Sequence, residues 1–405
     1  MMTTPFVNKH IVLGVTGSVA AYKAVDLASK MTQAGAQVDV ILTESALHFV
    51  SALQFQAVTG RKAYTDADLW GGEAHVVHIQ LGHAADMLVI APATASTMAK
   101  LACGLGDNLL SVTALASSCP ILLCPAMDLG MYQNPATQKN VSILKERGLH
   151  FFGPAEGHLA SGLSGPGRFE EPAAILAQLR YLLSRGGSLK DRQIVVTAGG
   201  TQEPIDPVRV VSNRSSGKQG YAIAQAALDS GAAVTLITTP TALIAPAGAE
   251  VITVHSAAQM LTAVMEKSKT ADALIMAAAV ADFTPEKVAD NKIKKGDDSL
   301  TIQLAPTKDI LLEVANQKKS SGYPRFTIGF AAESEHLLEN AAIKIEKKKL
   351  DLIVANNISQ KGSGFEVDTN QVVFLGKDGS RETLPNLPKS EVAEKIIHKL
   401  ITWLA

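Results

Sequence analysis

The sequence predicts an α/β protein of two domains, each built on a largely parallel sheet. Two segments, beginning at residues 10 and 193, share one pattern: an apolar strand, a glycine-containing turn, a helix, a glycine stop and a second strand. This pattern is typical of βαβ units. The chain of 405 residues is too long for one ordinary core. Hydrophobic residues make up 47% of it and aromatic residues only 5%, which suits tightly packed α/β layers.

The charge balance and the cysteines exclude several classes of protein. The formal net charge is −1, which gives no general attraction to nucleic acid or to membranes, so we expect neither as a partner. The three cysteines contain no CxxC pair, which argues against a disulfide framework or a zinc site and fits a reducing cytoplasm. No apolar stretch is long enough for a signal peptide or a bilayer span. We therefore expect a soluble cytoplasmic protein.

The first domain is expected to bind a ligand at one edge of its sheet. Its predicted elements are strands at residues 10–15, 37–42, 85–91 and 119–124 and a helix at 20–33. Three turns, at residues 16–18, 92–97 and 125–128, follow the carboxyl ends of strands. Ligands of open α/β sheets bind at such ends, so these turns should form one pocket. No charged fingerprint follows the first strand, and small residues dominate the turns, so flavin mononucleotide (FMN) is favoured over NAD.

Two further features of this domain each permit two interpretations. His78 lies just before the strand at 85–91, and a lone histidine can be structural or catalytic. Residues 153–168 contain five glycines and two prolines, so we expect neither helix nor regular strand there. This segment is predicted to be either a lid over the site or a disordered connector.

A short polar segment at residues 184–188 marks the seam between the domains. It follows a helix predicted at residues 173–183. We place the first domain at residues 1–187 and the second at residues 188–405.

The second domain opens with the stretch on which its chemistry depends. A buried strand at 194–196 is broken by Gly199 and Gly200, and a polar loop at 212–218 precedes a helix predicted at 221–228. A polar loop before a helix N-terminus is an arrangement that binds phosphate, because free N–H groups and the helix dipole face the anion. The alternative is a solvated serine-rich loop, since the stretch matches neither a P-loop nor GxGxxG.

Charged residues follow the later strands of the second domain. A buried strand at 273–279 is followed by Asp282, and a basic, hairpin-like piece lies at 291–296. A strand at 327–330 precedes a helix at 336–349 that ends in four lysines. Such lysines usually match the helix dipole. Together with the phosphate-type loop they would instead bind one polyanion with a divalent cation.

These motifs resemble one family, the bifunctional bacterial flavoproteins of coenzyme A biosynthesis, in which phosphopantothenoylcysteine decarboxylase is fused to phosphopantothenate–cysteine ligase. The resemblance covers nearly the whole chain, in the same domain order. It implies two Rossmann-like domains, an N-terminal flavoprotein domain with FMN and a C-terminal nucleotide-binding ligase domain with CTP and Mg²⁺. The motifs that carry it are TGSVAAYK, HIQLGHAADMLVIAPATAST, PAMDLGMY and GPGR in the first half and SNRSSGKQG, AAAVADF, KIKK, GFAAES and KKKLDLIVANNIS in the second.

In the second domain, the resemblance implies that CTP activates the carboxylate of 4′-phosphopantothenate as an acyl-cytidylate, from which the amine of L-cysteine displaces CMP. Asn213 matches the residue that handles the acyl intermediate, and Lys292 one placed against the triphosphate. Asp282 matches a position at the nucleotide and its metal. The other nucleotide-binding matches are Met276, Ala277, Ala278, Lys308, Asp309, Ile310, Leu311, Phe330, Lys344 and Lys348. The family usually has proline where this chain has Lys308.

In the first domain, the resemblance implies that FMN oxidises the thiol of 4′-phosphopantothenoylcysteine, that CO2 is lost to give an enethiol, and that hydride and a proton then give 4′-phosphopantetheine. His78 matches the catalytic histidine. The flavin-binding matches are Gly17, Ser18, Ala20, Thr43, Pro92, Ala93 and Thr94. The family's flavin site is built at subunit contacts, which implies a homo-oligomer.

This chain departs from the family at the decarboxylase site. Asp128 stands where the family has asparagine, Ser161 where it has a proton-donating cysteine, and Leu163 where it has an acid. One interpretation is a working variant pair, in which a raised pKa lets Asp128 donate a hydrogen bond as an amide would. The other is that the final reduction step has been lost. Outside this family, a non-catalytic flavin-binding or regulatory subunit and an NAD(P)H-dependent reductase are the alternatives.

Overall fold

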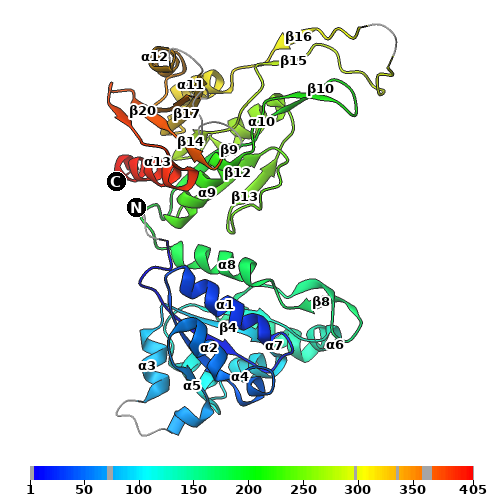
Figure 1. Ribbon diagram of the computed structural model, residues 1–405, viewed down its shortest axis with the longest axis vertical. Coiled ribbons are helices and arrows are strands. Elements are labelled where there is room, and N and C mark those ends of the chain that lie inside the picture. The colour runs from blue at the N-terminus through cyan, green and yellow to red at the C-terminus, as the bar shows by residue number, and fades with distance from the viewer. Residues whose placement is uncertain (1–3, 71–75, 296–298, 334–336, 358–366, 405) are drawn as a thin grey trace. The chain divides into compact units, whose positions relative to one another are not determined.

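The computed structural model describes residues 4–70, 76–295, 299–333, 337–357 and 367–404. The chain divides into two compact units, Thr3–Leu183 and Ser184–Ala405 (Figure 1). This division lies four residues before the boundary placed between 187 and 188. In the described part of the chain, no helix combines the length and the apolar character that a membrane span requires.

A six-stranded, wholly parallel sheet forms the centre of the first unit. The strand order β3-β2-β1-β4-β5-β6 reverses between β1 and β4, as in Rossmann-like domains. The strands are β1 His10–Val15, β2 Gln37–Leu42, β3 Ala63–Tyr64, β4 Met87–Ala93, β5 Ile121–Pro125 and β6 His150–Phe151. Carboxyl ends on both sides of the reversal create the crevice in which such sheets bind ligands.

Helices cover both faces of this sheet and form two apolar cores. One core includes Leu27 and Ile175, from α1 and α8, and the other includes Met98 and Val141, from α4 and α7. The helices are α1 Ala21–Gln33, α2 Ala52–Thr59, α3 Val77–Ala84, α4 Ala95–Cys103, α5 Leu109–Ala116, α6 Leu129–Gln133, α7 Pro135–Glu146 and α8 Pro172–Ser184, with 3₁₀ helices at Glu44–His48 and Asp66–Trp70.

An eight-stranded sheet forms the centre of the second unit. Its order is β13-β12-β9-β14-β17-β18-β20-β21, parallel up to β18 and antiparallel at β20 and β21. The strands are β9 Gln193–Ala198, β12 Ala233–Thr238, β13 Glu250–Thr253, β14 Ala273–Met276, β17 Phe326–Glu333, β18 Leu352–Asn357, β20 Val372–Gly376 and β21 Arg381–Thr383. The helices are α9 Lys218–Asp229, α10 Ala257–Lys267, α11 Ile310–Ser321, α12 Leu337–Lys348 and α13 Lys389–Leu404.

An arm projects from this sheet (Figure 1). It consists of the antiparallel pairs β10 Gln202–Pro204 with β11 Val210–Ser212 and β15 Phe283–Pro285 with β16 Leu304–Pro306, and of the described residues between β15 and β16. A further small pair is β19 Thr369–Asn370 with β22 Leu387–Pro388. The predicted hairpin at 291–296 is wrong for its described residues, 291–295, which form no strand. The hairpin strands lie on either side of them.

Three aspartates fix the register of the two sheets in the same way. Asp86, Asp272 and Asp351 each precede a central strand, and each carboxylate accepts the N–H of the residue at the start of the neighbouring strand, at 2.8, 2.9 and 2.8 Å. The N–H of each aspartate donates to the carbonyl of that same residue, at 2.8, 2.8 and 2.9 Å. This reciprocal pair satisfies both backbone groups at the point where the ladder begins.

The glycine-rich segment of the first unit forms a hairpin, which corrects the expectation that it contains no regular strand. β7 Ala155–His158 pairs with β8 Ser164–Arg168, with Ser161 in the connecting turn. Gly167 has φ 152°, and a Cβ there would lie 2.4 Å from the Met127 carbonyl oxygen. The glycines therefore allow this hairpin to lie directly on the loop after β5, where the Met127 N–H donates to the Gly167 carbonyl at 3.0 Å.

Candidate functional site

The first unit has a cavity of about 500 Å³ at the carboxyl ends of its strands. As expected, the three turns meet there. Thr16 joins two of them, because its hydroxyl donates to the Pro92 carbonyl at 2.7 Å and accepts the Thr94 N–H at 3.1 Å. Of the residues predicted to act in this domain, the cavity is lined by Gly17, Ser18, Ala20, Thr94, Asp128 and Ser161. Apolar groups of Met127, Met131 and Phe169 complete the wall.

Three predicted flavin residues do not line this cavity. Pro92 and Ala93 are buried within β4, where Pro92 serves as the acceptor for Thr16. Thr43 is buried and caps the 3₁₀ helix that follows it, accepting the Ala46 N–H at 3.3 Å. Their positions support the turns that face the cavity.

Asp128 and Ser161 lie together on the cavity wall. The Ser161 hydroxyl and the Gly130 N–H hold the pKa of Asp128 below its ordinary value, and Oδ1 accepts that N–H at 2.9 Å. Oδ2 is buried and has no hydrogen-bond partner among the described residues. In the free chain the pKa of Asp128 is thus lowered, not raised as one interpretation of the sequence required.

His78 lies away from this cavity in the same unit. It is the second residue of α3, which packs against α5, whereas Asp128 and Ser161 belong to the α6 and β7–β8 region on the other side of the unit (Figure 1). Its Nδ1 atom is buried and has no hydrogen-bond partner among the described residues. A single chain therefore does not bring His78 to Asp128.

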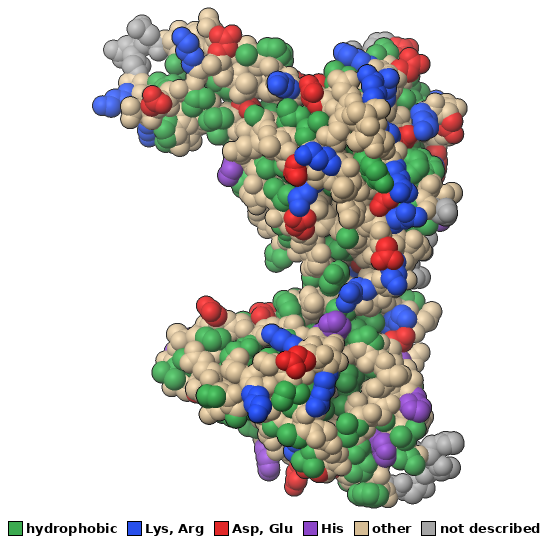
Figure 2. All heavy atoms as spheres, turned by 180° about the vertical axis from the view of Figure 1, so that it is seen from behind, with side chains coloured by type: hydrophobic (Ala, Val, Ile, Leu, Met, Phe, Trp, Pro, Cys, Tyr) green, Lys and Arg blue, Asp and Glu red, His purple; other side chains and the backbone are tan. Residues whose placement is uncertain are grey.

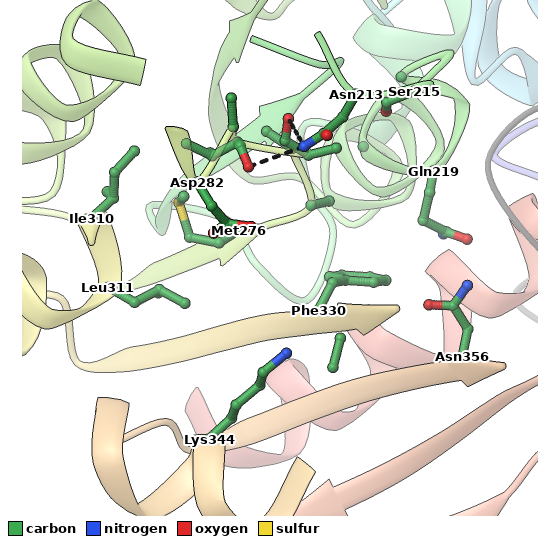
Figure 3. A pocket seen from close by; sticks show the side chains of 18 of the residues that line it. Asn213, Ser215, Gln219, Met276, Asp282, Ile310, Leu311, Phe330, Lys344 and Asn356 are labelled. Carbon is green, nitrogen blue, oxygen red and sulfur yellow. Dashed lines mark hydrogen bonds between the residues drawn. The ribbon is translucent and has the colours of Figure 1, made fainter. Parts of the chain in front are cut away.

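The second unit has a cavity of about 440 Å³ at the carboxyl ends of β14 and β17 (Figure 3). The predicted residues that line it are Asn213, Met276, Ala277, Ala278, Asp282, Lys308, Asp309, Ile310, Leu311, Phe330, Lys344 and Lys348. Lys292 does not line it. That lysine is exposed on the arm, in the connection between β15 and β16.

The loop before α9 closes one side of this cavity. The Asn213 Nδ2 donates to the Val280 carbonyl at 3.1 Å, and this bond ties the loop to the segment that follows β14 (Figure 3). The amide oxygen takes no part in this bond. Gly199 has φ 85°, and a Cβ there would lie 2.0 Å from the Thr239 hydroxyl, so only glycine permits this turn. β14 ends earlier than predicted because the Ala278 and Ala281 N–H groups turn to the hydroxyls of Thr197 and Thr201.

Helix α9 presents its N-terminus to the cavity. It begins at Lys218, three residues before the predicted start. Its N-cap residue is Gly217, which has φ 77° and makes no side-chain cap. The N-cap residue therefore supplies no capping side chain, as is common where a helix N-terminus binds an anion.

Among the residues that the structure describes, five lysines surround the cavity, and the sequence pointed to four of them. Lys344 and Lys348 come from α12 and Lys308 precedes α11, while Lys218 belongs to the predicted phosphate-binding loop and only Lys389 was not predicted. The Lys348 Nζ lies 3.0 Å from an Asp309 oxygen. Burial, with the charge of Lys218, lowers the pKa of Lys389. One feature of the sequence could have pointed to Lys389: it is a lysine at the first position of a helix, where the helix dipole disfavours a cation.

Asp282 is the strand-end carboxylate predicted to bind a metal, and it lies on the cavity wall. Among the described residues there is no group of three or more His, Cys, Asp or Glu side chains that could hold an ion. Mg²⁺ commonly uses one or two carboxylates together with substrate phosphates and water. Asp282 therefore fits a cation that arrives with a nucleotide.

The chain is similar to proteins of one functional class over almost its full length. The family model "Flavoprotein" matches residues 2–184, and the model "DNA/pantothenate metabolism flavoprotein C-terminal domain" matches residues 189–404. The coenzyme A biosynthesis bifunctional protein CoaBC of Bacillus subtilis is 44% identical over 97% of both chains. The CoaBC proteins of Mycobacterium tuberculosis and Vibrio vulnificus are 44% and 41% identical over 98% of both chains.

Two solved structures each resemble one half of the chain. The C-terminal domain of a CoaBC protein is 38% identical and covers 54% of this chain and 98% of its own, with a TM-score of 0.46. A PPC decarboxylase mutant complexed with pantothenoylaminoethenethiol is 38% identical and covers 43% and 97%, with a TM-score of 0.41.

Proposed function

This chain belongs to the CoaBC family of bifunctional coenzyme A biosynthesis proteins, and from that premise we propose the chemistry of each of its cavities. It is an enzyme with a flavoprotein decarboxylase half and a ligase half. The assignment of substrates, cofactors and residues to the two cavities is our proposal. The cysteines are free thiols, which supports a cytoplasmic location.

We propose that the second cavity joins L-cysteine to 4′-phosphopantothenate with CTP. The observation that carries this is the cavity of the second unit, which gathers lysines, a helix N-terminus and a strand-end aspartate in one place. Lys344, Lys348 and the N-terminus of α9 supply the positive charge that a nucleotidyl-transfer transition state needs. Asp282 would hold Mg²⁺ together with phosphate oxygens. The bond of Asn213 to Val280 holds its side chain at the cavity and supports a role in which Asn213 contacts the acyl group.

Two variants of the full-length enzyme separate the roles in this cavity. We expect Lys292→Gln to slow the burst of pyrophosphate from CTP and 4′-phosphopantothenate in the absence of cysteine, because charge at the triphosphate is removed. Asn213→Asp should keep the burst but pass the cytidylate on to cysteine slowly. If both variants lose the burst equally, the division of roles is wrong.

We propose that the first cavity decarboxylates 4′-phosphopantothenoylcysteine with FMN. The small-residue turns at 17–20 and 94 and the apolar wall of Met127 and Phe169 fit one phosphate and a flat ring. Bound FMN supplies a hydride acceptor and donor. A substrate carboxylate beside Asp128 would raise its pKa, so we propose that Asp128 takes up a proton on binding and donates a hydrogen bond. Ser161, in the hairpin above it, would pass a proton to the enethiol carbon.

We propose that the protein is a homo-oligomer. His78 lies away from the first cavity and Lys292 away from the second, so a second copy is the natural source of each. The arm also exposes apolar side chains, visible in Figure 2 among charged ones. Their exposed fractions are 64% at Val208, 53% at Phe283, 51% at Val288 and 58% at Leu300.

Mixing of inactive variants tests this assembly. His78→Asn and Asp128→Ala proteins should each release no CO2, and subunit exchange between them should restore part of the activity, because some sites then receive both native residues. Activity that stays absent after exchange, with oligomers shown to have mixed, would place His78 and Asp128 in one chain and contradict the proposal.

A further inference from the structure

The arm contains a buried carboxylate that the proposed chemistry does not use. Asp206 lies in the turn between β10 and β11, and its side chain is 0% exposed. A buried aspartate needs donors for both of its oxygens, because an unpaired charge there would be strongly destabilising. The identity of those donors shows what this residue holds in place.

The two oxygens of Asp206 serve different parts of the chain. Oδ1 accepts the N–H groups of Val208 and Arg209, both at 2.8 Å, and these bonds close the local turn. Oδ2 accepts the Arg209 Nη1 at 2.7 Å and the N–H of Ile293, 87 residues further on, at 3.1 Å. Burial opposes ionisation, but the N–H donors and Arg209 outweigh it and hold the pKa of Asp206 below its ordinary value.

Ile293 is held at both of its backbone groups. While its N–H donates to Asp206, its carbonyl accepts the Arg209 Nη1 at 3.0 Å. Nearby, the Ala289 N–H donates to the Ile205 carbonyl at 3.0 Å. Residues 286–295 contain neither helix nor strand, so these bonds replace a ladder in fixing the segment to the β10–β11 turn.

Lys292 directly precedes this anchored residue. Consecutive Cα atoms are about 3.8 Å apart, so anchoring Ile293 limits where the backbone of Lys292 can lie. Within the turn itself, the Val208 and Arg209 N–H groups and the Arg209 Nη1 already give both oxygens a donor. The additional bonds to Ile293 serve the segment that carries the lysine.

We propose that Asp206 and Arg209 are a positioning pair for Lys292 in formation of the acyl-cytidylate. The inference rests on the proposed role of Lys292 at the triphosphate. The pair does not touch the nucleotide; it holds the arm segment so that the ammonium group of Lys292 meets the phosphates in a fixed place. A displacement of about 1 Å in such a group costs on the order of 100-fold in rate.

Four substitutions in the full-length enzyme test the pair. Asp206→Asn keeps the shape and removes the charge, and Arg209→Gln removes both bonds of Nη1. Arg209→Lys keeps one nitrogen, which can make both bonds because Nη1 alone makes them now. Asp290→Asn is the matched control, since Asp290 is exposed and lies two residues from Lys292. It removes one carboxylate charge from the arm, in the segment that carries Lys292, without touching the pair.

The measurement is the pyrophosphate burst from CTP and 4′-phosphopantothenate without cysteine, at saturating and at limiting CTP. We expect Asp206→Asn and Arg209→Gln to slow the burst about 10- to 100-fold at saturating CTP, while Arg209→Lys and Asp290→Asn stay within about 3-fold of the wild type. The same substitutions are then made in a Lys292→Gln background. There, Asp206→Asn should slow the burst no further, because the group that it positions is gone.

Equal slowing by Asp206→Asn in both backgrounds would overturn the proposal, since the pair would then support the fold in general. A wild-type burst in Asp206→Asn and Arg209→Gln would also overturn it. If Asp206→Asn does not fold, Arg209→Gln and Arg209→Lys are compared instead, each in the wild-type and the Lys292→Gln backgrounds. A wild-type burst in Lys292→Gln would show that Lys292 does not act at the triphosphate, and this inference would fail with that role. If Lys292→Gln slows the burst but the Asp206 and Arg209 variants do not, Lys292 keeps its role and only its positioning by the pair is rejected.

Discussion

Replacement of Asp351 by alanine should destabilise the ligase unit and leave the flavoprotein unit unchanged. The Asp351 side chain is 7% exposed, and its carboxylate accepts the Thr327 N–H at 2.8 Å. The Lys318 and Lys377 ammonium groups lie 3.0 and 2.6 Å from its oxygens. Asp351→Ala therefore leaves a buried N–H without its acceptor and removes two ion pairs.

The free energy of unfolding should fall by about 3 kcal/mol. An unsatisfied buried N–H costs about 1–3 kcal/mol, and each partly exposed ion pair contributes about 0–1 kcal/mol. For a unit of this size, 1 kcal/mol corresponds to about 2–4 °C in the unfolding midpoint, so we expect a shift of about 6–12 °C. Asp351→Asn keeps an acceptor oxygen for Thr327 and should cost about 1 kcal/mol.

Calorimetry of the full-length protein measures this effect, because two-domain chains commonly unfold in separate transitions. The fluorescence of Trp403, which stacks on Phe326 at 5.2 Å beside Thr327, identifies the transition of the ligase unit. Asp86→Ala is the matched control, since it removes the corresponding bond in the other unit. A shift under about 2 °C for Asp351→Ala, or equal shifts of both transitions, would refute the reasoning.

The remaining predictions concern the flavoprotein unit. His78→Asn should keep bound FMN and ligase activity but abolish CO2 release, and CO2 release at the wild-type rate would remove His78 from the mechanism. Ser161→Ala should accumulate an enethiol two hydrogens lighter than 4′-phosphopantetheine. Ser161→Cys should give the fully reduced product at the wild-type rate or faster, because a thiol is a far stronger acid than an alcohol. A fully reduced product from Ser161→Ala at the wild-type rate would end the proton-donor assignment. His10 has a raised pKa through its hydrogen bond to Asp39, although burial and Arg61 oppose this. Protonated His10 therefore stabilises the folded unit fully below about pH 6.5 and loses this contribution as the pH rises through its folded pKa. Between about pH 6 and 8, the calorimetric unfolding midpoint should therefore fall less steeply with pH in His10→Asn than in the wild type. The same pH dependence in both proteins would contradict this role of His10.

The sheets and their ligand edges could be predicted from sequence because apolar runs and glycine turns act locally. β1 and β2 occupy the predicted residues, and the turns after β1, β4 and β5 meet at one cavity. The hairpin β7–β8 could not be predicted in this way. Its glycines resemble a breaker in sequence, but they permit close approach to the Met127 carbonyl, which only the tertiary structure shows.

Residues that act through distant partners were also outside the reach of sequence patterns. Lys389 belongs to the last helix, yet it lines the cavity beside the N-terminus of α9. Asp206 anchors Ile293 across 87 positions of sequence. The pKa of Asp128 depends on Ser161, which a hairpin turn places beside it. In each case the contact forms only when distant parts of the chain fold together, so no local sequence pattern predicts it.

Mass spectrometry of the product formed from 4′-phosphopantothenate, L-cysteine and CTP tests most directly whether one chain performs both reactions. We expect 4′-phosphopantetheine, with one CMP and one pyrophosphate released for each molecule formed and no product when CTP is omitted. Accumulation of 4′-phosphopantothenoylcysteine, or of the enethiol, by the wild-type protein would contradict a complete decarboxylase half and would show that Asp128 and Ser161 do not replace the residues usual in this family.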